Sequence, residues 1–103
     1  MARLIEVQDP HVCPRALRIQ MGDTLMFSAT GGHIRSAGDV VELIGPFVPA
    51  VVDDLGNVVA PSGAPNTILF RALQDGRAII DVMFGDPFHR TLAVREFEIS
   101  VES

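Results

Sequence analysis

The residues that could carry chemistry in this sequence begin with its cysteine and histidines. One cysteine, Cys13, and three histidines, His11, His33 and His89, equal in number a tetrahedral zinc shell or three ligands of a copper site. Only His11 and Cys13 are close together, and the proline on each side of that pair indicates an ordinary turn between strands. No Cys-x-x-Cys or His-x-x-x-His spacing is present. We therefore predict no metal and no cofactor.

Nucleophilic catalysis would need a serine or cysteine held beside a base. No serine lies in a Gly-x-Ser-x-Gly context, and nothing in the sequence fixes Cys13 beside a distant histidine. The carboxylates show no spacing typical of a catalytic pair, because most of them lie in predicted turns. The sequence predicts a protein that is not an enzyme.

The glycine-rich segment 31–38 holds one cation and so invites comparison with a phosphate-binding loop. It lacks the Gly-Lys-Ser/Thr ending, and no helix is predicted after it to receive a phosphate. We predict instead a mobile loop in which His33 and Arg35 contact a partner, as loops on a rigid scaffold commonly do.

Charge and composition exclude several classes of function. Thirteen acidic residues against eight basic ones, all arginine and spread singly along the chain, argue against nucleic acid and against a basic membrane surface. No apolar run approaches the roughly 20 residues of a membrane span. A charge inside the first residues and a single cysteine favour a cytoplasmic protein. The length of 103 residues predicts one domain, 1–103.

The elements that position these residues are predicted to be short strands. Nine glycines and seven prolines interrupt the chain, and several pieces alternate apolar and polar residues, most clearly in 23–30 and 96–102. The segment 48–60 is predicted to be a hairpin, and 66–75 fits either a helix or a strand, of which we favour the strand. The predicted fold is all-β, an immunoglobulin-like antiparallel β-sandwich of seven to nine short strands.

Adjacent apolar pairs predict apolar side chains on both faces of several strands. The pairs are Val40-Val41, Leu43-Ile44, Val51-Val52, Val58-Val59 and Ile79-Ile80. Either they form a surface patch that binds a partner, including a second copy, or bulges turn some of them into one core. Within 77–84, Ile79, Asp81 and Met83 share the predicted outer face and are the candidate assembly face.

The C-terminal half resembles a known family. The carrying motifs are Ser62-Gly63-Ala64-Pro65, Ile68-Leu69-Phe70-Arg71-Ala72-Leu73, Gly76-Arg77-Ala78-Ile79-Ile80, Asp86-Pro87-Phe88 and Phe97-Glu98-Ile99-Ser100-Val101. Over roughly residues 62–101 this pattern is similar to the chagasin-type inhibitors of papain-like cysteine peptidases. That family is an immunoglobulin-like sandwich that blocks the peptidase cleft with three loops. In its third loop the family has Arg-Pro-Trp, where this chain has Asp86, Pro87 and Phe88.

The resemblance implies a protein-binding module that presents the loops 30–37, 61–66 and 85–91. Its most specific form is a peptidase inhibitor, and the alternative is a structural subunit that assembles through an apolar sheet face. The partner is then a protein, either a papain-like peptidase or another copy of the chain. The predicted partner-binding residues are Thr30, Gly31, Gly32, His33, Arg35, Ser62, Gly63, Asp86, Pro87, Phe88 and His89.

Overall fold

The computed structural model of the chain describes residues 2–60, 65–85 and 93–103. In these ranges the secondary structure consists of strands and turns, and none of it is a helix that could cross a membrane. The strands are β1 (Leu4–Val7), β2 (Ala16–Gln20), β3 (Thr24–Ser28), β4 (Gly31–Ser36), β5 (Val41–Phe47), β6 (Val51–Val52), β7 (Val58–Val59), β8 (Thr67–Ala72), β9 (Gly76–Phe84) and β10 (Ala93–Glu102).

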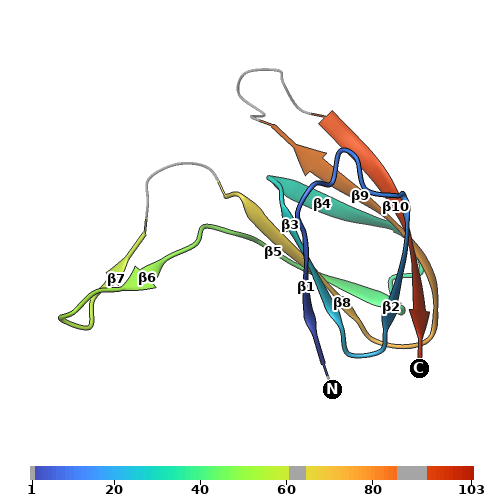
Figure 1. Cartoon of the computed structure of the whole chain (residues 1–103), viewed down its shortest axis with the longest axis horizontal. Coiled ribbons are helices and arrows are strands. Elements are labelled where there is room, and N and C mark those ends of the chain that lie inside the picture. The colour runs from blue at the N-terminus through green and yellow to red at the C-terminus, as the bar shows by residue number, and fades with distance from the viewer. Residues whose placement is uncertain (1, 61–64, 86–92) are drawn as a thin grey trace.

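Two four-stranded sheets pack face to face (Figure 1). The first has the order β1-β3-β8-β5 and the second the order β2-β10-β9-β4, which confirms the predicted all-β sandwich. The prediction of a purely antiparallel arrangement is wrong at two edges, because β1 pairs with β3, and β2 with β10, in parallel. The connection 8–15 passes from one sheet to the other, so β1 and β2 each pair with a neighbouring strand instead of with each other.

The core lies between the sheets and is built from the alternating residues that the sequence indicated. Phe27 of β3, Phe70 of β8 and Phe97 of β10 are fully buried. The Phe27 ring meets the Phe70 ring edge-on at 5.9 Å between centroids, and it meets the Phe97 ring at 5.3 Å. Such aromatic pairs add stability beyond the area that they bury, and here the Phe27–Phe97 pair joins the two sheets.

The ambiguous segment 66–75 contains a strand, as favoured. In β8 the side chains of Ile68, Phe70 and Ala72 are buried, while those between them are not. This strand lies between β3 and β5 in its sheet, so its backbone groups are paired on both sides. Tertiary pairing therefore decides what the apolar pattern alone left open.

The prediction of a mobile loop over 31–38 is wrong for most of that segment. Residues 31–36 form β4, which pairs with β9 at the edge of the second sheet. Gly32 faces inward, and a Cβ at that position would lie 2.8 Å from Ile68 Cδ1 and 2.9 Å from Phe70 Cζ. Glycine is therefore required because the two sheets approach each other closely there.

Four of the five apolar pairs of the sequence have three different outcomes, and the fifth, Leu43-Ile44, is half-buried. Val40 and Val41 are both buried, because Val40 lies in the turn before β5 and its carbonyl accepts a hydrogen bond from the Leu73 backbone N–H at 2.8 Å. Ile79 and Ile80 divide between the outer face and the core. The two valine pairs in the predicted hairpin, 51–52 and 58–59, are exposed on both sides.

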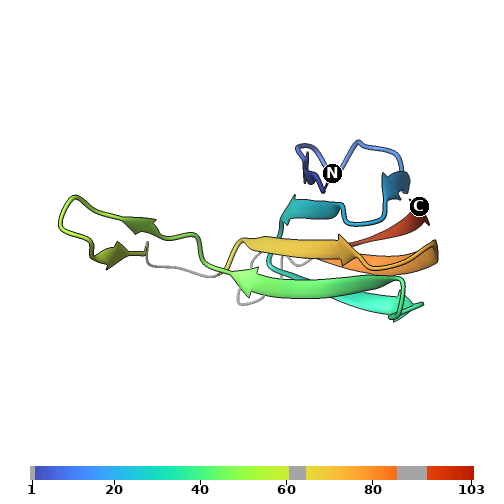
Figure 2. The same cartoon turned by 90° about the horizontal axis from the view of Figure 1, so that it is seen from below.

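That hairpin is the most unusual feature of the shape. Residues 48–60, which we call the arm, leave the end of β5 and extend away from the sandwich as a two-stranded ribbon (Figures 1 and 2). Every residue of the arm is exposed. The radius of gyration is 14.6 Å, above the roughly 13 Å expected for a compact chain of about 100 residues, which agrees with a projecting element.

Candidate partner-binding site

The sequence-predicted loop residues fall into three groups. Thr30 lies in the tight turn between β3 and β4, where its hydroxyl donates to the Met83 carbonyl at 3.1 Å. Gly31, Gly32, His33 and Arg35 lie on β4 and not in a loop. The remaining predicted residues fall outside the described ranges and are Ser62, Gly63, Asp86, Pro87, Phe88 and His89.

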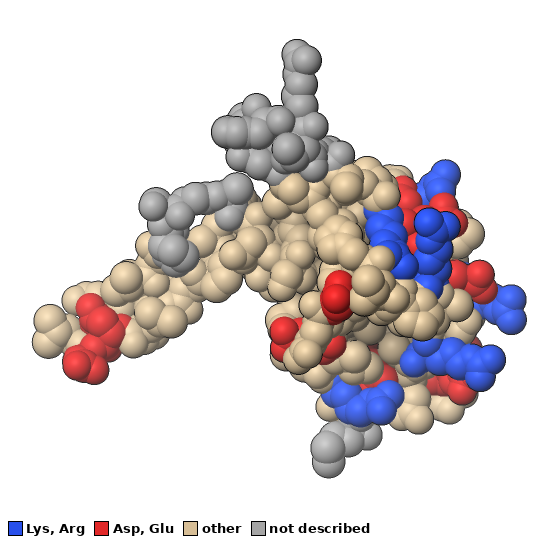
Figure 3. All heavy atoms as spheres, turned by 45° about the horizontal axis from the view of Figure 1, so that its top comes forward, with Lys and Arg blue, Asp and Glu red and all other residues tan. Residues whose placement is uncertain are grey.

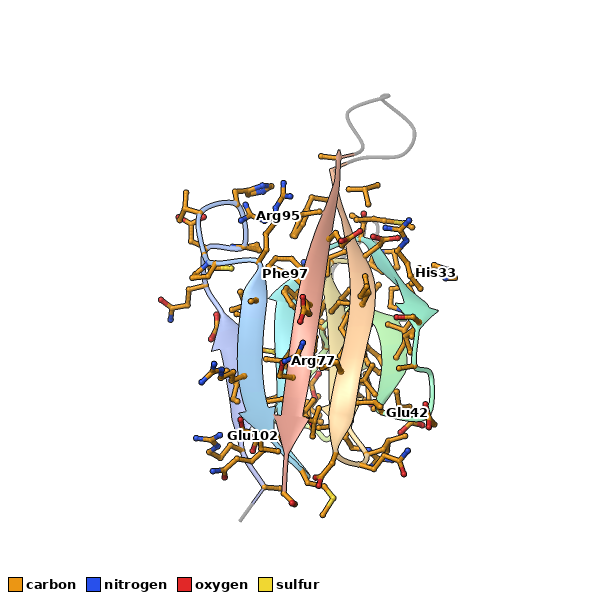
Figure 4. All side chains as sticks on the ribbon, turned by 90° about the vertical axis from the view of Figure 1, so that its right-hand side faces the viewer. His33, Glu42, Arg77, Arg95, Phe97 and Glu102 are labelled. Carbon is orange, nitrogen blue, oxygen red and sulfur yellow. The ribbon has the colours of Figure 1, made fainter. Side chains whose placement is uncertain are left out.

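The outer face of the second sheet is charged. Ile79, Asp81 and Met83 do share this face, as predicted from the alternation in β9. However, the Arg35 guanidinium is ion-paired to Asp81 at 3.5 Å and also to Glu96, and Arg77 faces Glu98 at 3.7 Å on the same side (Figure 4 labels Arg77). The structure therefore does not support the expectation of an apolar assembly face here, because neighbouring strands supply ion pairs around Ile79 and Met83.

The candidate metal ligands do not converge within the described ranges. Cys13 Sγ lies 3.9 Å from the Pro10 carbonyl oxygen, in the connection before β2. His33 is on β4, at the opposite edge of the same sheet. Among the residues that the structure describes, no group of three or more histidine, cysteine, aspartate or glutamate side chains is placed to hold a metal ion. His89 lies outside these ranges.

The arm carries a different kind of surface. In its ribbon Val51 is paired with Val59 and Val52 with Val58. Because successive side chains of a strand point to opposite faces, one valine pair lies on each face of the ribbon. Relative exposures are 67% and 48% for the first pair and 68% and 74% for the second. Both faces of the arm are thus apolar and open to solvent.

The tip of the arm is held by its own turn. The Asp53 carboxylate accepts backbone N–H groups from Leu55 and Asn57, each at 2.9 Å, and the Asp53 backbone N–H donates to the Asn57 carbonyl at 2.9 Å. Gly56 has a φ of +82°, a conformation that glycine adopts without steric cost. Local hydrogen bonds therefore shape the arm, although it contributes no side chain to the buried core.

The root of the arm is tied to the sandwich. The Asn66 backbone N–H donates to the Phe47 carbonyl at 3.0 Å, and Phe47 of β5 is paired with Thr67 of β8. Asn66 in turn accepts the Ala29 backbone N–H at 2.9 Å through its carbonyl. Backbone hydrogen bonds through Asn66 thus connect Phe47, the residue before the arm, to the turn between β3 and β4.

A hollow of about 340 Å³ lies beside that turn, at the end of the sandwich where β3 and β9 finish. We call it the end hollow. The connection between β1 and β2 crosses the same end (Figure 1) and contributes His11, whose ring lies 4.7 Å from the ring of Phe84. The residues that line the end hollow are His11, Ser28, Ala29, Thr30, Asn66, Phe84 and Gly85.

Charge is distributed unevenly between the arm and the sandwich. The arm contains Asp53 and Asp54, and no arginine or lysine occurs anywhere in residues 36–70. In Figure 3 the arm accordingly shows acidic groups near its tip and no basic ones, whereas the arginines gather on the sandwich. The arm is therefore an apolar ribbon with an acidic tip.

At the end of the sandwich away from the end hollow, the buried carboxylate of Asp23 holds β1 in place. Asp23, which is fully buried, accepts bonds from the Arg3 guanidinium at 2.6 Å and from the Gln20 backbone N–H at 2.8 Å. Chiefly because of the hydrogen bond from Arg3, the pKa of Asp23 is lowered to about 2. This ion pair holds β1 beside β3 and takes no part in the arm or the end hollow.

Sequence reasoning found the hairpin but did not recognise that it projects from the sandwich with both faces exposed. The sequence signal for an exposed hairpin is the two valine pairs on either side of the turn. The turn contains acidic residues, and no basic residue lies nearby to pair with them. The hairpin was interpreted as part of a sheet face, because periodicity does not distinguish a strand in a sandwich from a strand in a free ribbon.

Comparison with known proteins bears on the fold. No protein-family model matches the chain, and no curated protein matches it in sequence. Among solved structures, the crystal structure of the cysteine protease inhibitor EhICP2 from Entamoeba histolytica is similar over 98% of this chain and 96% of that chain, with a TM-score of 0.53 and 13% sequence identity. The solution structure of amebosin matches over 99% of both chains, with a TM-score of 0.45 and 14% identity. The chain therefore shares the fold of a cysteine protease inhibitor, in agreement with the resemblance seen at residues 62–101.

Proposed function

We propose that this chain is a non-enzymatic protein-binding module that inhibits a papain-like cysteine peptidase and uses the arm as its main contact. The observation that carries the proposal is the exposure of apolar side chains on both faces of the arm. Exposed apolar groups gathered on one element are typical of interaction sites, because burial against a partner removes them from water.

The arrangement of these side chains specifies the shape of the partner surface. A ribbon with one apolar face would lie flat on a partner, whereas this ribbon has a valine pair on each face. Both valine pairs are covered only if the ribbon enters a cleft. The backbone of each cleft wall then lies about 10 Å from the centre plane of the ribbon, the usual spacing between packed sheets. We therefore propose a cleft-bearing partner.

The turn at the tip favours binding for a further reason. A ribbon that is already ordered by the Asp53 hydrogen bonds loses less conformational entropy on binding than a flexible loop. The acidic tip then favours a cleft that is neutral or positively charged at its far end.

The class of partner follows from the similarity of the fold. EhICP2 is a cysteine protease inhibitor, and the motifs in residues 62–101 resemble inhibitors that block the cleft of papain-like peptidases. The arm leads into the predicted loop 61–66, so it stands beside a region that this resemblance assigns to binding. Both considerations support a cysteine peptidase as the partner.

The test is inhibition of papain, measured with a fluorogenic substrate. We expect the wild-type chain to inhibit, and the double variant Val51→Glu/Val59→Glu to inhibit at least about tenfold less, the loss expected when a central apolar contact is removed. The control is Leu4→Glu, which adds a charge at a side chain of similar exposure, 65%, on β1. Full inhibition by the arm variant would exclude the arm, and no inhibition by the wild type would exclude papain-like peptidases.

A further inference from the structure

The end hollow gives a second contact at a different place from the arm, and this inference rests on the proposed function. We infer that it receives an uncharged aromatic side chain with a polar tip, tyrosine or tryptophan, from the partner that covers the arm. In this contact the partner inserts a side chain into the chain described here, which is the reverse of the insertion of the arm.

The aromatic preference comes from the wall formed by His11 and Phe84. Their rings are tilted by 50° at a centroid distance of 4.7 Å, and Phe84 is almost fully buried, so its ring is fixed by the core. Aromatic rings attract one another in offset or edge-to-face geometry, and such contacts exceed what area burial alone provides. An aliphatic side chain would gain only the burial.

The polar tip is indicated by the rim. Ser28, Thr30 and Asn66 bring two hydroxyl groups and a carboxamide to the hollow. The Asn66 Oδ1 accepts from the Thr67 hydroxyl at 2.9 Å, which directs the amide and leaves its NH₂ group as a donor. A tyrosine hydroxyl or a tryptophan N–H fits such a rim, and among the residues that the structure describes the lining contains neither carboxylate nor arginine to favour a charged ligand.

The size of the hollow agrees with one side chain. Pockets that enclose small ligands usually range from about 300 to 1,000 Å³, so about 340 Å³ lies at the lower limit. Tyrosine and tryptophan are also the side chains that most often dominate the affinity of protein interfaces.

Arg95 of β10 fixes the connection that carries the His11 wall of the hollow. Its guanidinium donates to the His11 carbonyl, and also to the Cys13 carbonyl at 2.6 Å. The same guanidinium carbon lies 5.4 Å from the centre of the buried Phe97 ring. Arg95 is therefore a positioning residue that fastens the connection between β1 and β2, and with it the His11 ring, to the rigid core.

The position of the hollow relates it to the arm. Asn66 lines the hollow, and its backbone N–H donates to the carbonyl of Phe47, the residue immediately before the arm. A partner that encloses the arm down to its root therefore reaches the rim of the hollow.

The experiment titrates the isotopically labelled full chain with N-acetyl-tyrosinamide, and separately with N-acetyl-leucinamide, by amide NMR. We expect saturable shifts at Ser28, Thr30 and Gly85 with the tyrosine probe, a dissociation constant on the order of 1 mM for so small a ligand, and at least about tenfold weaker binding of the leucine probe. Shifts that do not saturate, or equal binding of both probes, would overturn the inference.

Variants locate the binding. Ser28→Trp fills the hollow and should abolish the shifts, whereas Ser36→Trp, at an exposed serine on β4, should leave them unchanged. Arg95→Ala should weaken probe binding, and its amide spectrum shows whether the sandwich remains folded. Retained binding in Ser28→Trp would contradict the assigned site. The arm variant Val51→Glu/Val59→Glu should bind the probe normally while it loses papain inhibition, so failure of this inference and failure of the proposed function are distinguishable.

Discussion

Asp23 and Gly56 have different roles, because Asp23 stabilises the fold and Gly56 shapes the arm that we propose as the contact. Asp23 acts inside the sandwich through the Arg3 ion pair, whereas Gly56 acts at the tip of the arm through its backbone conformation. Substitutions at the two positions are therefore expected to separate folding from function.

For Asp23, the expected result is a change in acid stability. Its pKa falls from the usual 3.8 to about 2 in the folded chain, so the carboxylate stabilises the fold fully above about pH 4, and this contribution disappears as the pH falls toward 2. Asp23→Asn should lower the urea midpoint at pH 7, and its difference from the wild type should shrink between pH 4 and pH 2. Asp54→Asn, at an exposed aspartate of the arm, is the control. A constant difference across this pH range would argue against the ion pair as the cause.

For Gly56, the expected result is weaker binding without loss of stability. An alanine at a φ of +82° costs roughly 1 kcal/mol, which should loosen the turn and reduce papain inhibition by about fivefold. The thermal midpoint should not change, because the arm packs on nothing in the core. Gly38→Ala is a matched control, since a Cβ meets nothing within 4 Å at either position and only Gly56 has a positive φ. Equal inhibition by the two variants would show that the turn does not order the arm.

At the scale of elements, β4 shows where sequence patterns fail. The alternation in β3 and β10 predicted the buried faces of those strands, because their alternating apolar residues, such as Phe27 and Phe97, are buried between the sheets. In β4 the inward position Gly32 has no side chain and Ile34 is the one large apolar residue that packs against the core, so the strand carries only a weak apolar pattern although it is paired along β9. The close approach of the sheets that requires this glycine is a property of the assembled sandwich and is not encoded in the segment itself.

Substitution in β4 should reveal that close approach. Gly32→Val is expected to destabilise the fold by about 1–3 kcal/mol, because its side chain would overlap Ile68 and Phe70, and to lower the thermal midpoint by several degrees. Gly31→Val on the outer side meets only Met83 at 3.5 Å or more, and it should fold with little loss. Calorimetry of the two variants makes the comparison; equal midpoints would mean that the inward space is larger than described.

The candidate site was only partly predictable for a related reason. Thr30 was predicted in a partner-binding loop; it lies in the turn between β3 and β4 and lines the end hollow, and its role in binding stays a prediction. The hairpin of the arm was predicted from its turn chemistry, but its projection into solvent depends on how β5 and β8 close the sheet around it. The hollow itself combines residues from four separate segments, which no spacing in the sequence brings together.

We expect the whole molecule to be a monomer in the absence of its partner. The outer face of the second sheet carries ion pairs, and the exposed apolar groups of the arm form a narrow ribbon instead of a broad self-complementary face. Light scattering with refractive-index detection should give 11.1 kDa across a concentration series, a detection suited to a chain without tryptophan or tyrosine. A defined multiple of this mass would instead indicate association through the arm.

Enclosure of the arm on both faces by a cleft can be followed by methyl NMR. The chain with labelled valine methyl groups is titrated with papain whose catalytic cysteine has been blocked, and the signals of Val51, Val52, Val58 and Val59 are followed. We expect the methyl signals of all four valines to change together, because each face of the ribbon carries one valine pair. Changes confined to one pair would mean that the arm lies on a surface, and unchanged signals in a chain that still binds papain would show that the arm is not the contact.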